Sequence, residues 1–500
     1  MVNVIYHVSS LEDWIDIALN MEEEHGWIPR YWISAGQREV VNTHFPSAIY
    51  QNRYSASKGR VPEEYNGPTK YALDKDILSE NLFHQAISAK MMDRMDPYKS
   101  FTYDERYRLY RDLLMYWLNV IEQYEIDIII FSTGPHHTSD YTLYTAAKHL
   151  GVKTIIFTPT SLPGVEYSQE NIYEGSNRVK SELEDSCGRD IPDRLNSYLE
   201  GIRSDENITP DHVIEEREKS IKPDVLENLS TIQKTLSRPL RAYERMVKIL
   251  DGGGGNRYKE KRGRIEDSNL DGAVLKYLKY KGMIKKKMLE KSYEKHSTKP
   301  DYNQDYIYFP MHYQPERTTC PEGGLYVDQF LVANLLNTNL PDGWVIYCKE
   351  HPSQFLPNLQ GELGREKYHY RDLSELENVQ LIDHNESSRK LIDNANATAT
   401  VTGTAGWESV VRSTPSIVFG NAWYRSCEGV FHVKTDDELS HCIEKIEQGH
   451  SIAENQVERF VHSVVSAGFF GYTSRSSTNP GWIPSEENVR SITNHLAKFE

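Results

Sequence analysis

Polar residues capable of chemistry follow two short apolar runs in the second half of the chain. The run 306–310 is followed by Gln314 and Glu316, and the run 344–349 is followed by His351. We call the residues that directly follow such a run the exit of the strand. Each of the two exits contains a proline, which ends the hydrogen-bonded ladder and fixes the direction in which the chain leaves the sheet. Parallel strands of a βαβ unit end at the same edge of a sheet, where open α/β sheets bind ligands. The spacing therefore predicts that Glu316 and His351 share one active-site rim.

The residue types at this rim suit transfer chemistry. Gln314 and Glu316 can hydrogen-bond sugar hydroxyls, and Glu316 can act as an acid, a base or a stabiliser of positive charge. His351 can donate a hydrogen bond to a phosphate and gains charge near neutrality beside an anion. The alternatives are a surface-loop glutamate and a histidine that only caps the backbone.

A small-residue turn joins a strand to a helix further along the chain. The strand 398–402 leads into Gly403, Thr404, Ala405 and Gly406, and the helix that follows carries Glu408. Glycines let a ligand approach the backbone, and a helix N-terminus attracts phosphate. Glu408 could accept a hydrogen bond from a ribose or sugar hydroxyl. Close packing alone also selects glycine at such turns, so this alternative stays open.

The first half of the chain has its own polar exit. His136, His137 and Asp140 follow the apolar run 126–132, and His136 or Asp140 could activate an acceptor hydroxyl if the two sheets face each other. Asp140 could instead be the N-cap of a helix from Thr142.

One aromatic residue and the absence of metal motifs complete the set of site predictions. Trp423 follows the strand 416–419 and could stack on a sugar or base, or cover the sheet edge. The sequence has no nucleotide-binding P-loop and no metal-binding motif, so we expect no metal and no cofactor.

The elements that position these residues alternate between strand and helix. Apolar runs predict strands at 2–8, 27–34, 126–132 and 153–157, and again at 306–310, 344–349, 379–382, 397–402, 416–419 and 430–433. Helix-period patterns lie between them. The sequence thus predicts an α/β protein with two Rossmann-like domains that face a cleft, together with a helical insertion.

The predicted domains follow from changes in composition along the chain. We expect an N-terminal Rossmann-like domain at 1–165, a helical insertion or linker at 166–300, a C-terminal Rossmann-like domain at 301–460 and a helical tail at 461–500. The insertion contains the flexible tract 252–256. It also contains a lysine-rich helix at 275–296, which is either a patch for anionic lipid or glycan or a solvated helix face.

Composition excludes some classes of function. The formal net charge of −16 argues against general nucleic-acid binding. Five scattered cysteines indicate free thiols in a reducing compartment. The start of the chain has no signal-peptide pattern, and no apolar run reaches the ~20 residues of a membrane span. We therefore expect a cytoplasmic protein, at most peripheral to the inner face of the membrane.

Several ordered motifs resemble those of one known family. They are Tyr308-Phe-Pro-Met-His-Tyr-Gln-Pro-Glu316, Tyr326-x-Asp328-Gln329, Lys349-Glu-His-Pro352, Gly403-Thr-Ala-Gly-Trp-Glu408 and Pro415-x-Ile-Val-Phe-Gly420. Together they resemble the capsule polysaccharide biosynthesis family, which includes bacterial transferases of the acid sugar Kdo from CMP-Kdo. The resemblance covers 300–430 well and 135–140 more loosely.

The resemblance implies a GT-B fold, no metal requirement and nucleotide-sugar binding in the C-terminal domain. It would place His351 at the donor phosphate, Gln314 and Glu316 near the transferred sugar, and Glu408 with 403–406 in the nucleotide pocket. The expected function is transfer of a sugar to a surface glycan or glycolipid. The alternatives are a non-catalytic glycan-binding or export scaffold, and a transferase of glycerophosphate or sugar phosphate.

Overall fold

The structure is a computed structural model. It describes residues 1–96, 100–185, 191–204, 258, 262–263, 272–474 and 482–499, with the backbone alone for 272–279. The predicted tract at 252–256 lies outside the described residues.

The first domain is built on a seven-stranded sheet of order β14-β6-β5-β4-β1-β2-β3. Strands β1 to β5 run parallel, and β6 and β14 add an antiparallel edge. The central strand β4 is buried along its whole length, as an apolar strand covered on both faces must be. The strands are β1 (Val2–His7), β2 (Trp27–Ser34), β3 (Ile49–Asn52), β4 (Ile128–Phe131), β5 (Lys153–Pro159), β6 (Val165–Gln169) and β14 (Phe469–Phe470).

Helices cover both faces of this sheet. One face packs against α1 (Asp13–His25) and α22 (Ser485–Ala497), and the other packs against α5 (Leu82–Met95), α6 (Tyr103–Gln123) and α7 (Thr138–His149). The other helices among the described residues of this half are α2 (Arg38–His44), α3 (Arg53–Ser57), α4 (Lys75–Glu80), α8 (Asn177–Asp185) and α9 (Asp193–Arg203).

The second domain has a seven-stranded parallel sheet of order β13-β12-β11-β8-β9-β10-β7. Its strands are β7 (Ser297–Thr298), β8 (Tyr306–Pro310), β9 (Val345–Lys349), β10 (Val379–Ile382), β11 (Ala397–Thr400), β12 (Ser416–Val418) and β13 (Val430–His432). All six strands predicted in this half are present, and five of them are largely buried, whereas β13 at the sheet edge is half-buried.

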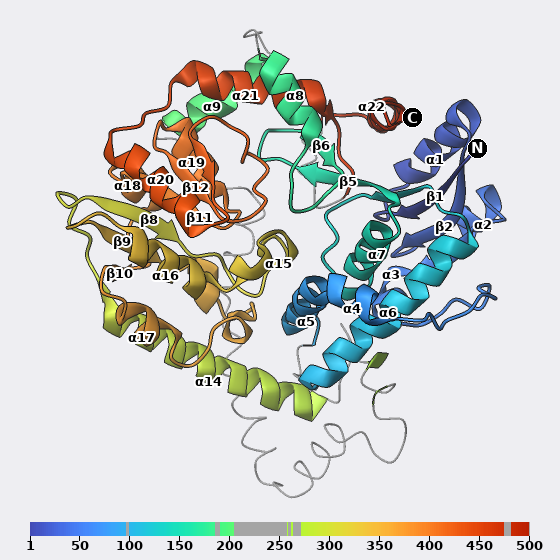
Figure 1. The fold of residues 1–500 in the computed structure, drawn as a ribbon, viewed down its shortest axis with the longest axis horizontal. Helices are drawn as coiled ribbons and strands as arrows, with labels where there is room; N and C mark the ends of the chain where they lie inside the picture. The colour runs from blue at the N-terminus through green and yellow to red at the C-terminus, as the bar shows by residue number, and fades with distance from the viewer. Residues whose placement is uncertain are drawn as a thin grey trace, which may run out of the picture.

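The helices of the second half surround this sheet and reach toward the first domain. They are α14 (Gly272–His296), α15 (Thr319–Glu322), α16 (Gln329–Asn339), α17 (His369–Ser374), α18 (Ser388–Asp393), α19 (Thr404–Val411), α20 (Asp436–Glu447) and α21 (Glu454–Ala467), with the 3-10 turns η1 (Gly324–Val327), η2 (Pro352–Phe355) and η3 (Gly361–Leu363). Figure 1 shows α14 running beneath the second domain toward the lower end of α6, and α15 lying between the two domains.

Each sheet has one point at which the strand order reverses. In the first sheet this point lies between β1 and β4, and in the second it lies between β8 and β11. Ligands of open α/β sheets bind outside the carboxyl ends of the strands at such points. The predicted fold class, two Rossmann-like domains in a GT-B-like arrangement, is confirmed.

The structure extends the first domain beyond its predicted limits. Strand β6 begins at Val165 and pairs with β5, so the sheet continues past the predicted boundary at 165. The predicted tail 461–500 returns to the first domain, where β14 pairs with β6 and α22 packs on α1. The physical reason is burial: Ile492 and Leu496 of α22 are fully buried in the core shared with β1.

Two further observations concern the cysteines and the membrane. Cys320, Cys348, Cys427 and Cys442 are free thiols in the protein interior. Within the described ranges, no helix combines the length and apolar character required to cross a bilayer.

Candidate functional site

The exits of β8 and β11 meet at the switch point of the second sheet through His312. Its Nδ1 lies 2.8 Å from Glu316 Oε1, and its Nε2 lies 3.0 Å from Thr400 Oγ1. The backbone N–H of Thr402 also points at Nε2, at 3.3 Å, and Gly403 N–H donates to Thr400 Oγ1. One imidazole thus joins the predicted Glu316 exit to the predicted small-residue turn.

These hydrogen bonds assign the tautomer of His312. A backbone N–H can only donate, so Nε2 must accept from Thr402. The proton of the neutral ring then lies on Nδ1 and is donated to Glu316. Burial alone would raise the pKa of the Glu316 carboxyl, but the adjacent His312, a hydrogen bond from Thr318 and the more distant His351 hold this pKa below its ordinary value. Glu316 is therefore an ionised carboxylate at neutral pH.

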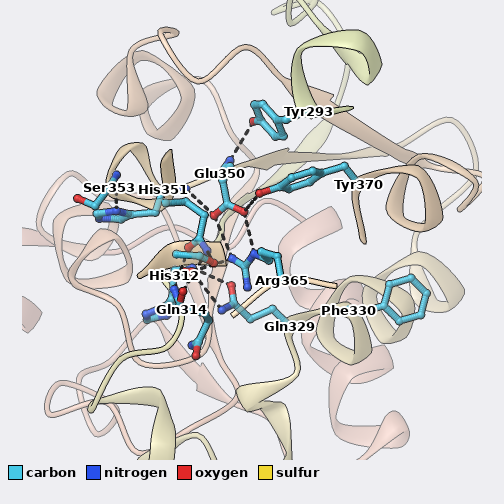
Figure 2. Close-up of polar contacts among 12 residues, drawn as sticks. Tyr293, His312, Gln314, Gln329, Phe330, Glu350, His351, Ser353, Arg365 and Tyr370 are labelled. Atoms are coloured by element: carbon cyan, nitrogen blue, oxygen red, sulfur yellow. Dashed lines mark hydrogen bonds and ion pairs between the residues drawn. The ribbon is translucent and has the colours of Figure 1, made fainter. Parts of the chain in front are cut away.

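A buried ion pair holds the exits of β8 and β9 together (Figure 2). Arg365 donates from Nε and Nη2 to the two oxygens of Glu350, at 2.8 and 2.9 Å, and also donates to the carbonyl of His312 at 2.8 Å. Glu350 in turn accepts from the backbone N–H of His351 at 2.8 Å and from the Tyr370 hydroxyl at 2.7 Å. Because both partners are almost completely buried, this pair fixes the backbone on which His312 and His351 are carried.

His351 and Gln314 flank this centre with different functions. Ser353 N–H donates to His351 Nδ1 at 3.1 Å, so the proton of the neutral ring is on Nε2. Gln314 is buried, and its side-chain amide donates to Thr319 Oγ1 while its backbone exchanges two hydrogen bonds with the Gln354 side chain. Gln314 thus organises the loop before Glu316.

The small-residue turn leads directly into α19, whose N-cap is Gly403. Thr404 is exposed and Ala405 is half-buried at this helix start. A Cβ at Gly406 would collide with the Tyr424 hydroxyl and Ser416 Oγ, so close packing is enough to require this glycine.

Glu408 and Trp423 have surroundings that belong to the protein interior. Glu408 is half-buried, and burial raises the pKa of its carboxyl while Arg412 opposes this shift. Trp423 packs against Trp407 and Phe460, with ring centroids 4.7 and 5.9 Å apart. Trp423 therefore belongs to the cluster around α21 and is separate from the His312 centre.

The switch point of the first sheet carries the predicted His136, His137 and Asp140. Asp140 lies in the first turn of α7, which begins at Thr138, and its Oδ1 accepts the N–H of His137 at 2.6 Å and that of Tyr141 at 2.8 Å. Burial alone would raise the pKa of Asp140, but the hydrogen bond and charge of His137 hold it well below the usual range. Burial lowers the pKa of His136 well below its usual value.

Ligand atoms of His136, His137 and Asp140 all lie within 4.8 Å of one another, which makes them a geometrically feasible metal group among the described residues. However, the Arg53 guanidinium lies 3.1 Å from both ring nitrogens of His137. A second cation beside this guanidinium would be repelled, so the donor set does not fit a metal well.

The two switch points face each other, and Arg94 of α5 joins them. Its guanidinium donates to the carbonyl of Glu316 at 2.5 Å and to the carbonyl of His136. A small pocket at this junction is lined by residues of both domains, among them Lys90, Arg94, Gln314, Glu316 and Cys320. The structure thus brings the predicted Glu316 and His136 to opposite sides of one junction.

Sequence reasoning did not select several residues at this junction. His312 lies four positions before Glu316 in a motif that was recognised, and this short spacing was the available signal. Glu350 likewise lies inside a recognised motif, next to His351. Arg53, Arg94 and Arg365 lie outside the motifs and act through contacts with other elements, which no local pattern indicates.

The fold and site together define a two-domain protein of GT-B-like architecture with a polar junction between its sheets. Residues 272–448 match the family model described as "Capsule polysaccharide biosynthesis protein". This match covers less than half of the chain, and within its segment it confirms the resemblance of the motifs to that family. A search of curated proteins gave no match.

The solved structures that match include an epimerase and two structures of one transferase protein. The UDP-GlcNAc 2-epimerase of Methanocaldococcus jannaschii is 11% identical, with 93% of this chain and 99% of that chain covered and a TM-score of 0.24. Two Thermosulfurimonas dismutans KpsC structures are described as a β-Kdo 2,7 transferase and a β-Kdo 2,4 transferase. The first is 9% identical over 98% of this chain and 99% of that chain, and the second is 13% identical over 74% and 87%, each with a TM-score of 0.29. At these scores the likeness carries no argument about function.

Proposed function

We propose that this protein is a glycosyltransferase of surface-polysaccharide biosynthesis. It would move a sugar from a nucleotide donor, with CMP-Kdo as one candidate, to a glycan or glycolipid acceptor. The observation that carries the proposal is the Glu316–His312–Thr400 hydrogen-bonded set at the switch point of the family-matched domain, opposite the His136 loop of a second Rossmann-like domain. This arrangement supplies an ionised carboxylate, hydrogen-bond donors and a junction between domains.

In the proposed reaction the donor phosphate lies at His351 and at the start of α19. An Nε2–H donor and a helix N-terminus both favour a phosphate that gains negative charge as it leaves. Glu316, ionised beside His312, would lie next to the anomeric carbon and stabilise its developing positive charge. The bond from the anomeric carbon to the phosphate oxygen breaks, and its electron pair leaves with the nucleotide phosphate. The acceptor oxygen forms the new bond to the anomeric carbon, and its O–H bond breaks and releases the proton.

A nucleotide screen tests the donor class. The purified protein is heated with CMP, CDP, UDP, GDP and their common sugar conjugates, and its melting temperature is recorded. A ligand at about 100 times its dissociation constant adds about 2.7 kcal/mol of stability. A CMP-selective shift supports a Kdo-like donor, and a UDP or GDP response keeps the transferase and changes the sugar.

The variant His351→Ala tests the phosphate role. We expect turnover to fall by about 10²-fold, since loss of one donor to a developing oxyanion typically has this effect. The matched control is His441→Ala, which removes an exposed histidine of α20. Full turnover in His351→Ala would overturn the assignment of His351.

The two alternative functions give different results in the same screen. A non-catalytic glycan-binding or export scaffold predicts no response to any nucleotide and tolerance of Glu316→Ala in glycan assembly. A glycerophosphate or sugar-phosphate transferase predicts selectivity for CDP-glycerol or a related donor.

We also propose that α14 contacts an anionic lipid surface on which the acceptor is presented. The helix turns Lys285 and Lys286 inward, where they donate to the carbonyls of Glu362 and Leu356 at 2.6 and 2.7 Å. Its opposite face exposes Ile284 and Met288 among four lysines, at three- and four-residue steps. These lysines are Lys281, Lys287, Lys291 and Lys295. Exposed apolar residues ringed by lysine favour an anionic lipid interface.

A further inference from the structure

Glu322 is the last residue of α15, the short helix that lies between the two domains (Figure 1). A Cβ at Gly134 would lie 2.8 Å from Glu322 Oε1, so the carboxylate of one domain meets the backbone of the other where no side chain intervenes. The N–H of Asn421 donates to the Glu322 carbonyl at 3.0 Å and fixes this helix end to the exit of β12. Glu322 is therefore held at the carboxyl ends of both sheets.

The Glu322 carboxylate has no strong polar partner among the described side chains. Among the described residues, none forms an ion pair or side-chain hydrogen bond with it. The ionisable groups that act on it from its own domain are Arg317 and Glu316, and those from the first domain are Tyr167 and Tyr173. Burial raises the pKa of Glu322 to about 8, Glu316 adds to this shift and Arg317 opposes it.

The other acids and bases at the junction are less suited to accept a proton. Asp140 already accepts two backbone N–H groups, and its pKa is held well below the usual range. Glu316 accepts the proton of His312, and its pKa is also lowered. His136 has a pKa well below its usual value because it is buried. A general base works best when its pKa is close to the operating pH, and Glu322 meets this condition.

We propose that Glu322 is the general base that takes the proton of the acceptor hydroxyl. The inference rests on the proposed glycosyltransferase function. As the acceptor oxygen forms its bond to the anomeric carbon, its O–H bond breaks and the proton passes to the Glu322 carboxylate. The bond between the anomeric carbon and the donor phosphate breaks at the same time, and the nucleotide leaves with that electron pair. Glu322 later returns the proton to solvent.

The test compares wild type with Glu322→Gln, and Glu447→Gln serves as the control because it alters an exposed glutamate at the end of α20. The probe is the CMP-, UDP- or GDP-linked sugar that stabilises the wild type most. The measured reaction is transfer of its sugar to water, followed as free nucleotide between pH 6 and 9.5. We expect wild-type kcat/KM to rise with pH toward a limb near 8, because the base must be ionised. In Glu322→Gln this rise of kcat/KM with pH should disappear, and the rate should fall by about 10²–10⁴-fold. The nucleotide-induced thermal shift of the variant should be retained.

A melting experiment shows whether the variant is folded. Native Glu322 binds its proton more tightly than the unfolded chain, so it costs stability as the pH rises from about 4.5 to about 8. Glu322→Gln should accordingly be at least as stable as wild type at pH 9. Turnover within twofold of wild type with the same pH limb would overturn the inference and leave the proposed function intact. No thermal shift of the wild type with any nucleotide would overturn both.

Discussion

At the scale of single residues, the direction of each hydrogen bond decides which groups are charged. Thr402 N–H points at His312 Nε2, so the proton of the neutral ring lies on Nδ1 and is donated to Glu316. Glu316 can then serve as a fixed negative charge, whereas Glu322, without such a donor, holds its proton to a higher pH. Two glutamates six positions apart are thus suited to opposite tasks, as environment alone can separate two carboxyl groups.

This separation gives a prediction for acid stability. The pKa of Glu316 is lower in the folded than in the unfolded chain, so its contribution is present above about pH 4.5 and is lost as the pH falls through its folded value. Glu316→Gln should therefore be less stable at pH 7 by about 1.5–3 kcal/mol, the usual contribution of a hydrogen bond to a charged group. The difference should shrink below pH 4.5.

Urea unfolding of wild type and variant from pH 3 to 7 measures this effect. Glu375→Gln, at a carboxylate that is 67% exposed, is the control and should match wild type throughout. A stability difference for Glu316→Gln that stays constant with pH would contradict the predicted linkage.

At the scale of elements, the buried Glu350–Arg365 pair sets the relative position of two strand exits. Removing Arg365 leaves a buried carboxylate unpaired, which typically costs about 3–5 kcal/mol. Arg365→Met should show this loss in urea unfolding. It should also reduce turnover, because the His312 carbonyl loses its donor and Glu350, which accepts from the His351 N–H, loses the partner that holds it in place.

The double variant Glu350→Gln/Arg365→Met provides the control for this pair. It removes both charges and should recover part of the stability lost in Arg365→Met, since no unpaired charge remains. If the stability loss of the double variant equals the sum of the losses in Glu350→Gln and Arg365→Met, the ion pair does not couple the two exits.

A second element-scale prediction concerns the outer face of α14. Replacement of Lys281, Lys287, Lys291 and Lys295 by Gln should weaken binding to phosphatidylglycerol vesicles by about 4 kcal/mol, from about 1 kcal/mol per lysine near the surface. Vesicle co-sedimentation measures this. The control replaces Lys299, Lys390, Lys434 and Lys445, which are exposed elsewhere in the second domain. Equal loss in both variants would show only a net-charge effect.

At the scale of the whole molecule, the C-terminal elements of the chain pack onto the N-terminal domain. Strand β14 extends the first sheet and α22 covers α1, so the first domain is assembled from both ends of the sequence. Asn488 of α22 donates to Asp13 of α1 at 2.7 Å and strengthens this contact.

Truncation of one side chain in α22 tests this closure. Leu496 is fully buried, and Leu496→Ala should cost about 2–5 kcal/mol in urea unfolding, as the loss of a buried leucine does. Leu325→Ala, at a site that is 60% exposed, should change stability by less than about 0.5 kcal/mol. Similar values for both variants would mean that α22 does not stabilise the first domain.

The sequence by itself determined the fold class and the positions of most strands. Runs such as 126–132 and 306–310 are predominantly apolar and of strand length, a pattern typical of a strand buried between helices. The exits that carry Glu316 and His351 follow from the same argument, since neighbouring parallel strands end at one edge. Both β8 and β9 have this arrangement.

The tertiary structure alone decided how the exits are completed and what their side chains do. The short strands β3, β6 and β14 have little pattern of their own, and their pairing depends on neighbours distant in sequence. Arg94, Arg365 and Thr400 reach the junction from other elements, and the charge of Glu322 depends on burial against Gly134 of the opposite domain. Local patterns record which face of an element is buried, whereas hydrogen-bond partners and pKa values arise from tertiary contacts, both within each domain and between the two domains.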